Sequence, residues 1–185
     1  MACFATFACY SIILSTTFTT IHGIFSEQSL LSLSAKRMEK TTSLHFYFHD
    51  IHDGKNPTAM KIVEPPNESV GGFGTTFMAD NPLTEGPELS SKLVGRAQGI
   101  YAVASQHDSG LLMVLNFAFV DGMYNGSTVS ILGRNPFMEA IREMPIVGGT
   151  RVFQYARGYA LAKTFSMSMK TGDAVVEYNV SVLHY

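Results

Sequence analysis

Apolar and polar residues alternate along much of this chain, as they do in β-strands. In residues 44–51, Leu44, Phe46 and Phe48 fall on one side of the predicted strand, and Asp50 ends that side. A carboxyl group in this position lies either at the wet edge of a sheet or inside a pocket. Burial in a pocket favours the neutral form of a carboxyl group, which can donate a proton. We therefore place the candidate chemistry at Asp50.

Comparable patterns predict seven further strands. They cover residues 58–63, 72–80, 94–105, 111–120, 127–133, 152–167 and 174–184. Turn residues separate them: the cluster 52–57, the proline-containing surface loop 81–89 and the Asn125-Gly126 pair. Residues 135–144 are expected to form a helical turn or an irregular crossover. Many strands with no amphipathic helix between them predict an antiparallel barrel or sandwich in one domain.

The predicted strand 111–120 is apolar on both sides. Its second side carries Leu112, Val114, Ala118 and Val120. A strand on a solvated monomeric barrel would show a polar outer side. The pattern therefore predicts that a second subunit covers it, in a homo-oligomer.

The first 23 residues contain no charged side chain and have an apolar centre, which predicts a secretory signal peptide. They also hold both cysteines, Cys3 and Cys9, so the cleaved chain would have no disulfide. Residues 24–43 are expected to form a flexible leader, and residues 44–185 the folded domain. Three sequons are candidate glycan sites on a secreted chain: Asn67, Asn125 and, with least support because it lies in a strand pattern, Asn179.

Charge and motifs exclude several classes of protein. The net charge of −2 and the scattered Lys and Arg residues predict no nucleic-acid or membrane partner. His45 and His49 share a strand side but stand about 13 Å apart, too far for one metal ion. We find no signature of a phosphate loop, a nucleophile elbow or a redox centre, so we expect no metal and no cofactor.

Seven segments together resemble the plant dirigent proteins, most of all the branch that includes the pterocarpan synthases. They are 46–51 (FYFHDI), 54–59 (GKNPTA), 73–80 (FGTTFMAD), 94–99 (VGRAQG), 142–145 (REMP), 147–150 (VGGT) and 156–160 (ARGYA). The resemblance covers residues 44–185. It implies an eight-stranded antiparallel β-barrel of the allene-oxide-cyclase-like kind, usually a trimer although a dimer is possible. It also implies a glycosylated protein secreted to the apoplast or cell wall.

The resemblance also implies roles for single residues. Asp50 matches the family's acid, and Arg142 its pocket arginine. Tyr101, Asn135, Thr164 and Val176 are then expected to contact substrate. Asn135 stands where lignan-forming members carry a second acid. Arg151 stands where the family usually has glycine, and we expect it to narrow or recharge a mouth of the barrel.

The alternation of side chains along the predicted strands also indicates that Tyr101 and Thr164 point inward. Each shares its side of a strand with small residues, among them Ala97 and Ala160, which leave room for a ligand. The alternative for Asp50 is structural: its carboxylate could cap the turn at 52–54.

The resemblance leaves three functions open. In the first, the protein guides the coupling of phenoxy radicals made by a separate laccase or peroxidase, as in lignan formation, and has no oxidative centre of its own. In the second, it is a pterocarpan synthase-like dehydratase that closes an isoflavanol ring. In the third, it is a cell-wall scaffold for lignin deposition. For both chemical routes, the resemblance implies a phenolic substrate and a quinone methide held in the barrel.

Overall fold

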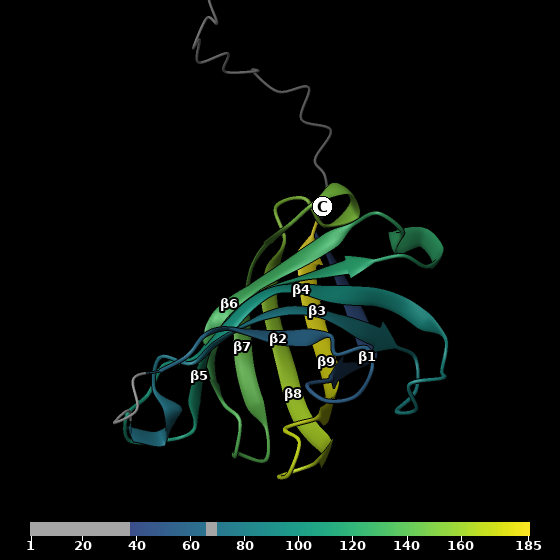
Figure 1. The fold of residues 1–185 in the computed structure, drawn as a ribbon. Helices are drawn as coiled ribbons and strands as arrows, with labels where there is room; N and C mark the ends of the chain where they lie inside the picture. Colours follow the sequence, from purple (N-terminus) through teal and green to yellow (C-terminus); the bar gives the residue numbers. More distant parts are fainter. Residues whose placement is uncertain (1–37, 66–69) are drawn as a thin grey trace, which may run out of the picture. The chain divides into compact units, whose positions relative to one another are not determined.

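The computed structural model describes residues 38–65 and 70–185. The predicted signal peptide, residues 24–37 of the predicted leader and the sequon at Asn67 lie outside the described residues. Nine strands and three short 3₁₀ turns occur in the described part (Figure 1). They are β1 (Lys40–Asp50), β2 (Ala59–Val63), η1 (Val70–Gly72), β3 (Thr76–Thr84), β4 (Leu93–Val103), β5 (Gly110–Phe119), η2 (Gly122–Tyr124), β6 (Thr128–Pro136), β7 (Arg142–Gly149), η3 (Arg151–Phe153), β8 (Arg157–Met167) and β9 (Ala174–His184).

The strands form one antiparallel sheet that closes on itself. Its order is β1-β9-β8-β7-β6-β5-β4-β3, with β2 added beside the first half of β3. The pairs Tyr47–Thr84 and Phe48–Leu83 join β1 to β3 and close an eight-stranded barrel. The predicted barrel is thus confirmed. In the described residues, no helix is long and apolar enough to cross a membrane.

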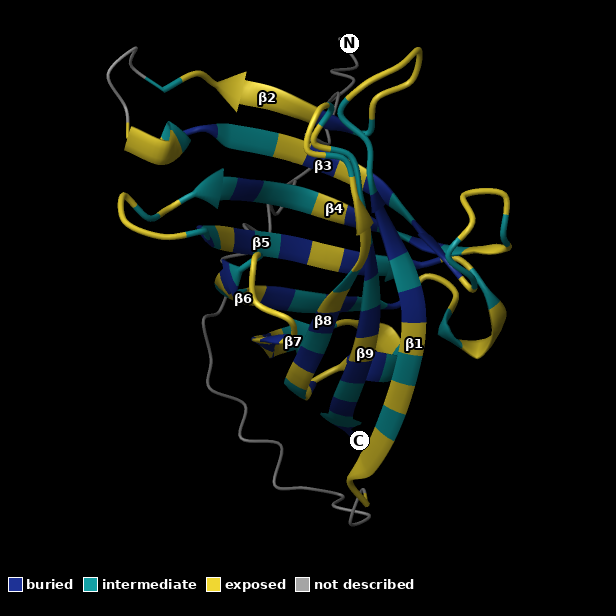
Figure 2. Ribbon diagram, turned by 90° about the horizontal axis from the view of Figure 1, so that it is seen from below, coloured by how far each residue is buried: buried dark blue, intermediate teal, exposed yellow. Residues whose placement is uncertain are grey.

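Alternation along each strand separates the inside of the barrel from the outside, which Figure 2 shows as bands of dark blue and lighter colour. On β1, Phe46 and Phe48 are almost fully buried, as the pattern predicts. The strand begins at Lys40, four residues earlier than expected.

The two ends of the barrel differ in their filling. Aromatic rings pack one end, where Phe46 lies 5.1 Å from Phe117 and 5.7 Å from Tyr178, measured between ring centroids. The small residues Ala97 and Ala160 are fully buried in the core and do not line the cavity, so they are not the residues that leave room for a ligand. The other end encloses a cavity of about 610 Å³. A ligand therefore has room at this end of the barrel.

Strand β3 continues through a stretch that the sequence predicts to be a surface loop. Asn81 and Pro82 lie within it, and Asn81 is fully buried. Pro82 is tolerated because no partner strand needs its missing N–H. On that edge of β3, the N–H of Asp80 still donates to the Thr58 carbonyl before β2, and pairing with β1 starts only at Leu83. The loop prediction is wrong for residues 81–84.

Strand β7 replaces part of the crossover expected at residues 135–144, and η3 and the turn after it replace the start of the long strand expected from residue 152. Arg142, Met144 and Ile146 alternate inward on β7. Pro145 hides this pattern in the sequence. It fits because Gly133 faces it from β6, where a side chain would lie within 2.8 Å of the proline ring.

Arg151 does not line the cavity, so the expected narrowing or recharging of a barrel mouth does not concern the mouth of this cavity. It follows β7, whereas the turns after β1, β6 and β8 line the cavity. Its backbone φ of 53° is left-handed, which explains why glycine suits this position.

Replacing Arg151 by glycine should raise the free energy of unfolding by about 0.5–1 kcal/mol. Left-handed backbone costs a residue with a Cβ about 1–2 kcal/mol, and the greater freedom of unfolded glycine offsets part of the gain. Urea denaturation measures the change. The control Arg157→Gly, on an extended strand, should destabilise the protein; destabilisation by Arg151→Gly as well would contradict the prediction.

Candidate functional site

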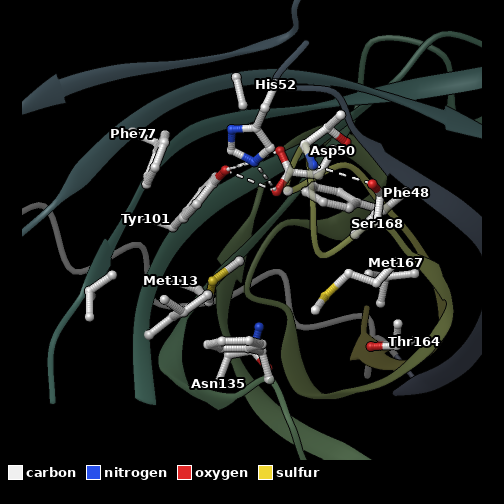
Figure 3. A pocket seen from close by; sticks show the side chains of 18 of the residues that line it. Phe48, Asp50, His52, Phe77, Tyr101, Met113, Asn135, Thr164, Met167 and Ser168 are labelled. Carbon is white, nitrogen blue, oxygen red and sulfur yellow. Dashed lines mark hydrogen bonds and ion pairs between the residues drawn. The ribbon is translucent and has the colours of Figure 1, made fainter. Parts of the chain in front are cut away.

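The cavity at the open end of the barrel is apolar with a few convergent polar groups, as ligand sites are (Figure 3). Phe48, Phe77 and Met113 contribute to its apolar wall. The structure brings together all the residues that the sequence predicts to act on substrate: Asp50, Tyr101, Asn135, Arg142, Thr164 and Val176.

Asp50 ends β1 on the inward side, and its carboxylate is the centre of a hydrogen-bonded cluster. The Tyr101 hydroxyl donates to it, with its Oη atom 2.9 Å from Oδ2 and 3.1 Å from Oδ1. The Asn81 side-chain amide donates to Oδ1 over 2.9 Å. His52 Nε2 lies 3.3 Å from Oδ2. Asp50 is only 15% exposed, so it faces the cavity rather than bulk water.

The turn after β1 is capped by other carboxylates. Asp173 accepts the backbone N–H groups of His52 and Asp53 over 2.7 and 3.2 Å, and Asp53 accepts that of Gly54. Asp173 belongs to the turn between β8 and β9. The alternative role of Asp50 as a turn cap is therefore not what the structure shows.

Asn81 was not predicted, because the sequence placed it in a surface loop. Its Oδ1 atom accepts a hydrogen bond from the Thr58 hydroxyl over 2.6 Å, which orients its amide nitrogen toward Asp50. The sequence signal that could have found it is alternation: Asn81 lies between Ala79 and Leu83 on one side of the strand, and all three are buried.

His52 is the second unpredicted member of the cluster. Its Nε2 atom lies 3.0 Å from Tyr101 Oη, and its ring packs edge-on against Phe77, with the ring centroids 5.0 Å apart. The hydrogen bond with Asp50 raises the pKa of His52 above its ordinary value, although burial opposes this. The sequence places His52 only in the turn cluster 52–57.

Tyr101 stays a neutral phenol in this environment. Burial, reinforced by the Asp50 carboxylate, raises the pKa of Tyr101 far above its ordinary value. Its ring stacks on Phe77 with centroids 5.0 Å apart and an angle of 17° between the planes. A fixed, neutral hydroxyl can donate one hydrogen bond and accept another.

Arg142 forms the second polar group of the cavity. Its Nε atom donates to Asn135 Oδ1 over 3.1 Å, and its Nη1 atom to Thr164 Oγ1 over 3.0 Å. The side chain is only 2% exposed, and burial lowers the pKa of its guanidinium. In residues 38–65 and 70–185, no carboxylate forms an ion pair with it.

The unpaired guanidinium can therefore bind an anionic oxygen of a ligand. Its two hydrogen bonds leave three of its five N–H groups for that purpose. Asn135 and Thr164 lie across the cavity from Asp50 and His52 in Figure 3. A ligand between them meets proton-transferring groups at one side and a positive charge at the other.

The described residues contain no cluster of three or more His, Cys, Asp or Glu residues that could hold a metal ion. His45 lies 3.0 Å from Glu177, and His49 2.6 Å from the Thr84 hydroxyl. The remaining sequons, Asn125 and Asn179, are both exposed.

Comparisons with known proteins agree with this architecture. The family model described as "Dirigent-like protein" matches residues 41–183. Pterocarpan synthase 1 of Glycine max is 49% identical over 93% of this chain and 94% of its own, and Dirigent protein 21 of Arabidopsis thaliana is 47% identical over 94% and 93%. The solved structure of the pterocarpan synthase dirigent protein GePTS1 is 54% identical, with a TM-score of 0.76 over 80% of this chain and 86% of that one.

Proposed function

The chain belongs to the dirigent protein family, whose members act on phenolic substrates, and we propose that it closes the ring of an isoflavanol by dehydration. The observation that carries this proposal is the polarity of the cavity. An acid–base cluster at Asp50 lies on one side, and the unpaired Arg142 guanidinium lies on the other. Dehydration of a benzylic alcohol needs both: a proton for the leaving oxygen and stabilisation of a phenolate.

The proposed reaction balances without an oxidant. Protonation of the benzylic hydroxyl lets water leave with the electrons of the C–O bond, and loss of a proton from the conjugated phenol gives a neutral quinone methide. The second phenol then attacks the benzylic carbon, forms the new C–O bond and releases its proton, while the first phenol is reprotonated. One water molecule is lost.

Each site residue has a place in this sequence. The Asp50 cluster handles the protons of the leaving hydroxyl and of the attacking phenol. Arg142 stabilises negative charge on the conjugated phenol oxygen, with Asn135 and Thr164 orienting the guanidinium. Tyr101 orients the substrate by hydrogen bonding, and Val176 packs against its rings. General acid–base catalysis of this kind typically contributes about 10²–10⁴-fold.

A second candidate function is the guidance of radical coupling. The apolar cavity could equally hold a phenoxy radical made by a laccase or peroxidase. Asn135 argues against the form of this chemistry that needs two acids, because it leaves Asp50 as the only carboxyl group among the described cavity-lining residues. The similar pterocarpan synthases also favour dehydration.

One experiment separates the functions. The purified protein is incubated with a dihydroxy isoflavanol in the absence of any oxidase, and ring-closed product is measured by chiral chromatography. Product formation supports the dehydratase. A change in product chirality that is seen only with laccase and coniferyl alcohol would support guidance of radical coupling instead. If neither result is obtained, the cell-wall scaffold is the function that remains.

We also propose that the outer wall of the barrel joins subunits into a trimer. Met78, Leu112 and Leu132 are each more than 40% exposed, on strands β3, β5 and β6, which lie in one part of the sheet together with β4. Analytical ultracentrifugation should give the mass of three chains. A monomer at micromolar concentration would contradict the proposal.

We also propose that the protein is secreted to the apoplast and glycosylated at Asn125. Dirigent proteins are generally extracellular, and the exposed Asn125 in the turn between β5 and β6 is accessible for a glycan.

A further inference from the structure

We propose that His52 holds the proton that the leaving hydroxyl takes up, and that Asp50 acts by keeping that imidazole protonated. This inference rests on the proposed dehydration and assigns its acid to a residue outside the predicted set. His52 lines the cavity and is 18% exposed, so substrate can reach the cluster to which it belongs.

The hydrogen-bond donors around Asp50 match an ionised carboxylate with a protonated imidazole beside it. Asn81 can only donate toward Asp50, because the Thr58 hydroxyl occupies its oxygen. Tyr101 also donates to Asp50, which leaves its oxygen free to accept from His52 Nε2 at 3.0 Å. Asn81 and Tyr101 thus donate to the carboxylate, and the imidazole lies beside it, with Nε2 3.3 Å from Oδ2.

The charged groups that face His52 come from several elements. Asp50 ends β1, and its hydrogen bond to the imidazole is the largest cause of the raised pKa of His52. Asp173, in the turn between β8 and β9, adds negative charge. Tyr101 on β4 is neutral, and Lys61 on β2 also lines the cavity. The raised pKa keeps the imidazole charged to higher pH than an ordinary histidine.

The ring of His52 is held in one orientation. Its backbone N–H donates to Asp173 over 2.7 Å, and Phe77 packs against the ring. Gly172 lies behind it with a φ of 87°, and a Cβ there would lie 3.5 Å from His52 Cδ2. The turns after β1 and β8 therefore fix Nε2 beside the Tyr101 hydroxyl.

This geometry gives a proton path to the substrate. When substrate is bound, the Tyr101 hydroxyl turns from Asp50 toward the leaving oxygen. As the benzylic C–O bond breaks, this hydroxyl passes its proton to the leaving oxygen and receives the Nε2 proton of His52. Tyr101 ends as a neutral phenol, and His52 as a neutral imidazole. The attacking phenol later returns a proton along the same path, and the imidazolium is restored.

The kinetic test compares His52→Gln with wild type across pH 5–9. Wild-type kcat should fall as pH rises through the raised pKa of His52, because the protonated form is the acid. His52→Gln should lower kcat at least about 10²-fold and abolish this decline. The matched control is His45→Gln, since His45 is 46% exposed beside Glu177 and does not line the cavity; it should keep the wild-type profile.

NMR titration of the histidine rings gives a readout that needs no turnover. The His52 signals should titrate above 6.5 in the wild type and return toward 6.5 in Asp50→Asn. A His52 that is neutral where turnover is maximal would overturn the inference, as would a His52→Gln variant with the wild-type profile. If the wild type itself closes no isoflavanol ring, the proposed function fails, and this role of His52 fails with it.

Discussion

Replacing Asp50 by asparagine should lower kcat/KM for the isoflavanol by about 10²–10⁴-fold and leave the barrel folded. The amide has the shape of the carboxylate and can still accept the hydrogen bond from Asn81. It carries no charge, however, so it cannot stabilise a protonated His52 or receive a proton. The effect should therefore appear mainly in kcat.

Steady-state kinetics and chiral analysis of the product measure this effect, with circular dichroism to verify the fold. Asp53→Asn is the matched control, because Asp53 lies three residues further on in the same turn and does not line the cavity. It should turn over at the wild-type rate. Normal turnover and stereochemistry in a folded Asp50→Asn variant would remove Asp50 from the mechanism.

The sequence predicts the barrel well because strand alternation is a local property. Phe46 and Phe48 point inward as their spacing requires, and Asp50 follows them to the edge of the cavity. The parts missed are those where a proline or glycine is tolerated for reasons of pairing. Pro82 lies in a gap between two partner strands, and Pro145 opposite Gly133; neither relation is visible along the chain.

The residues of the candidate site likewise fall into those that the sequence predicts and those that it misses. Strand alternation predicts Asp50 and the inward side of Tyr101, and the family resemblance adds Arg142 and the roles of all three; the structure gathers them in one cavity. His52 could not be assigned, because a residue in a turn has no parity. Its orientation depends on Asp173, which lies 121 residues away in the sequence.

The position of the aromatic rings links the packing inside the barrel to its function. Phe46 and Phe117 pack one end of the barrel and supply apolar burial there, and Tyr178 packs against both rings and also borders the cavity. The other end can then stay hollow and hold polar groups that add little to stability. Substitutions at this hollow end should consequently change activity more than folding.

The clearest case is Arg142, for which activity and stability should respond differently. Arg142→Met should lower kcat/KM by about 10²–10³-fold, the loss typical for removal of one group that stabilises a developing oxyanion. The free energy of unfolding should stay within about 1 kcal/mol of wild type or rise, because a buried charge without an acidic partner is costly to desolvate.

Two further variants test whether the lost activity of Arg142→Met comes from the lost positive charge in the cavity. Arg134→Met removes a surface cation paired with Asp108 and should leave activity unchanged. Asn135→Asp places a carboxylate where Asn135 Oδ1 accepts from Arg142 Nε over 3.1 Å, and the resulting ion pair should reduce the attraction of the guanidinium for a phenolate. Its activity should fall between those of wild type and Arg142→Met. Full activity in Asn135→Asp would mean that the guanidinium positions the substrate without binding a developing negative charge.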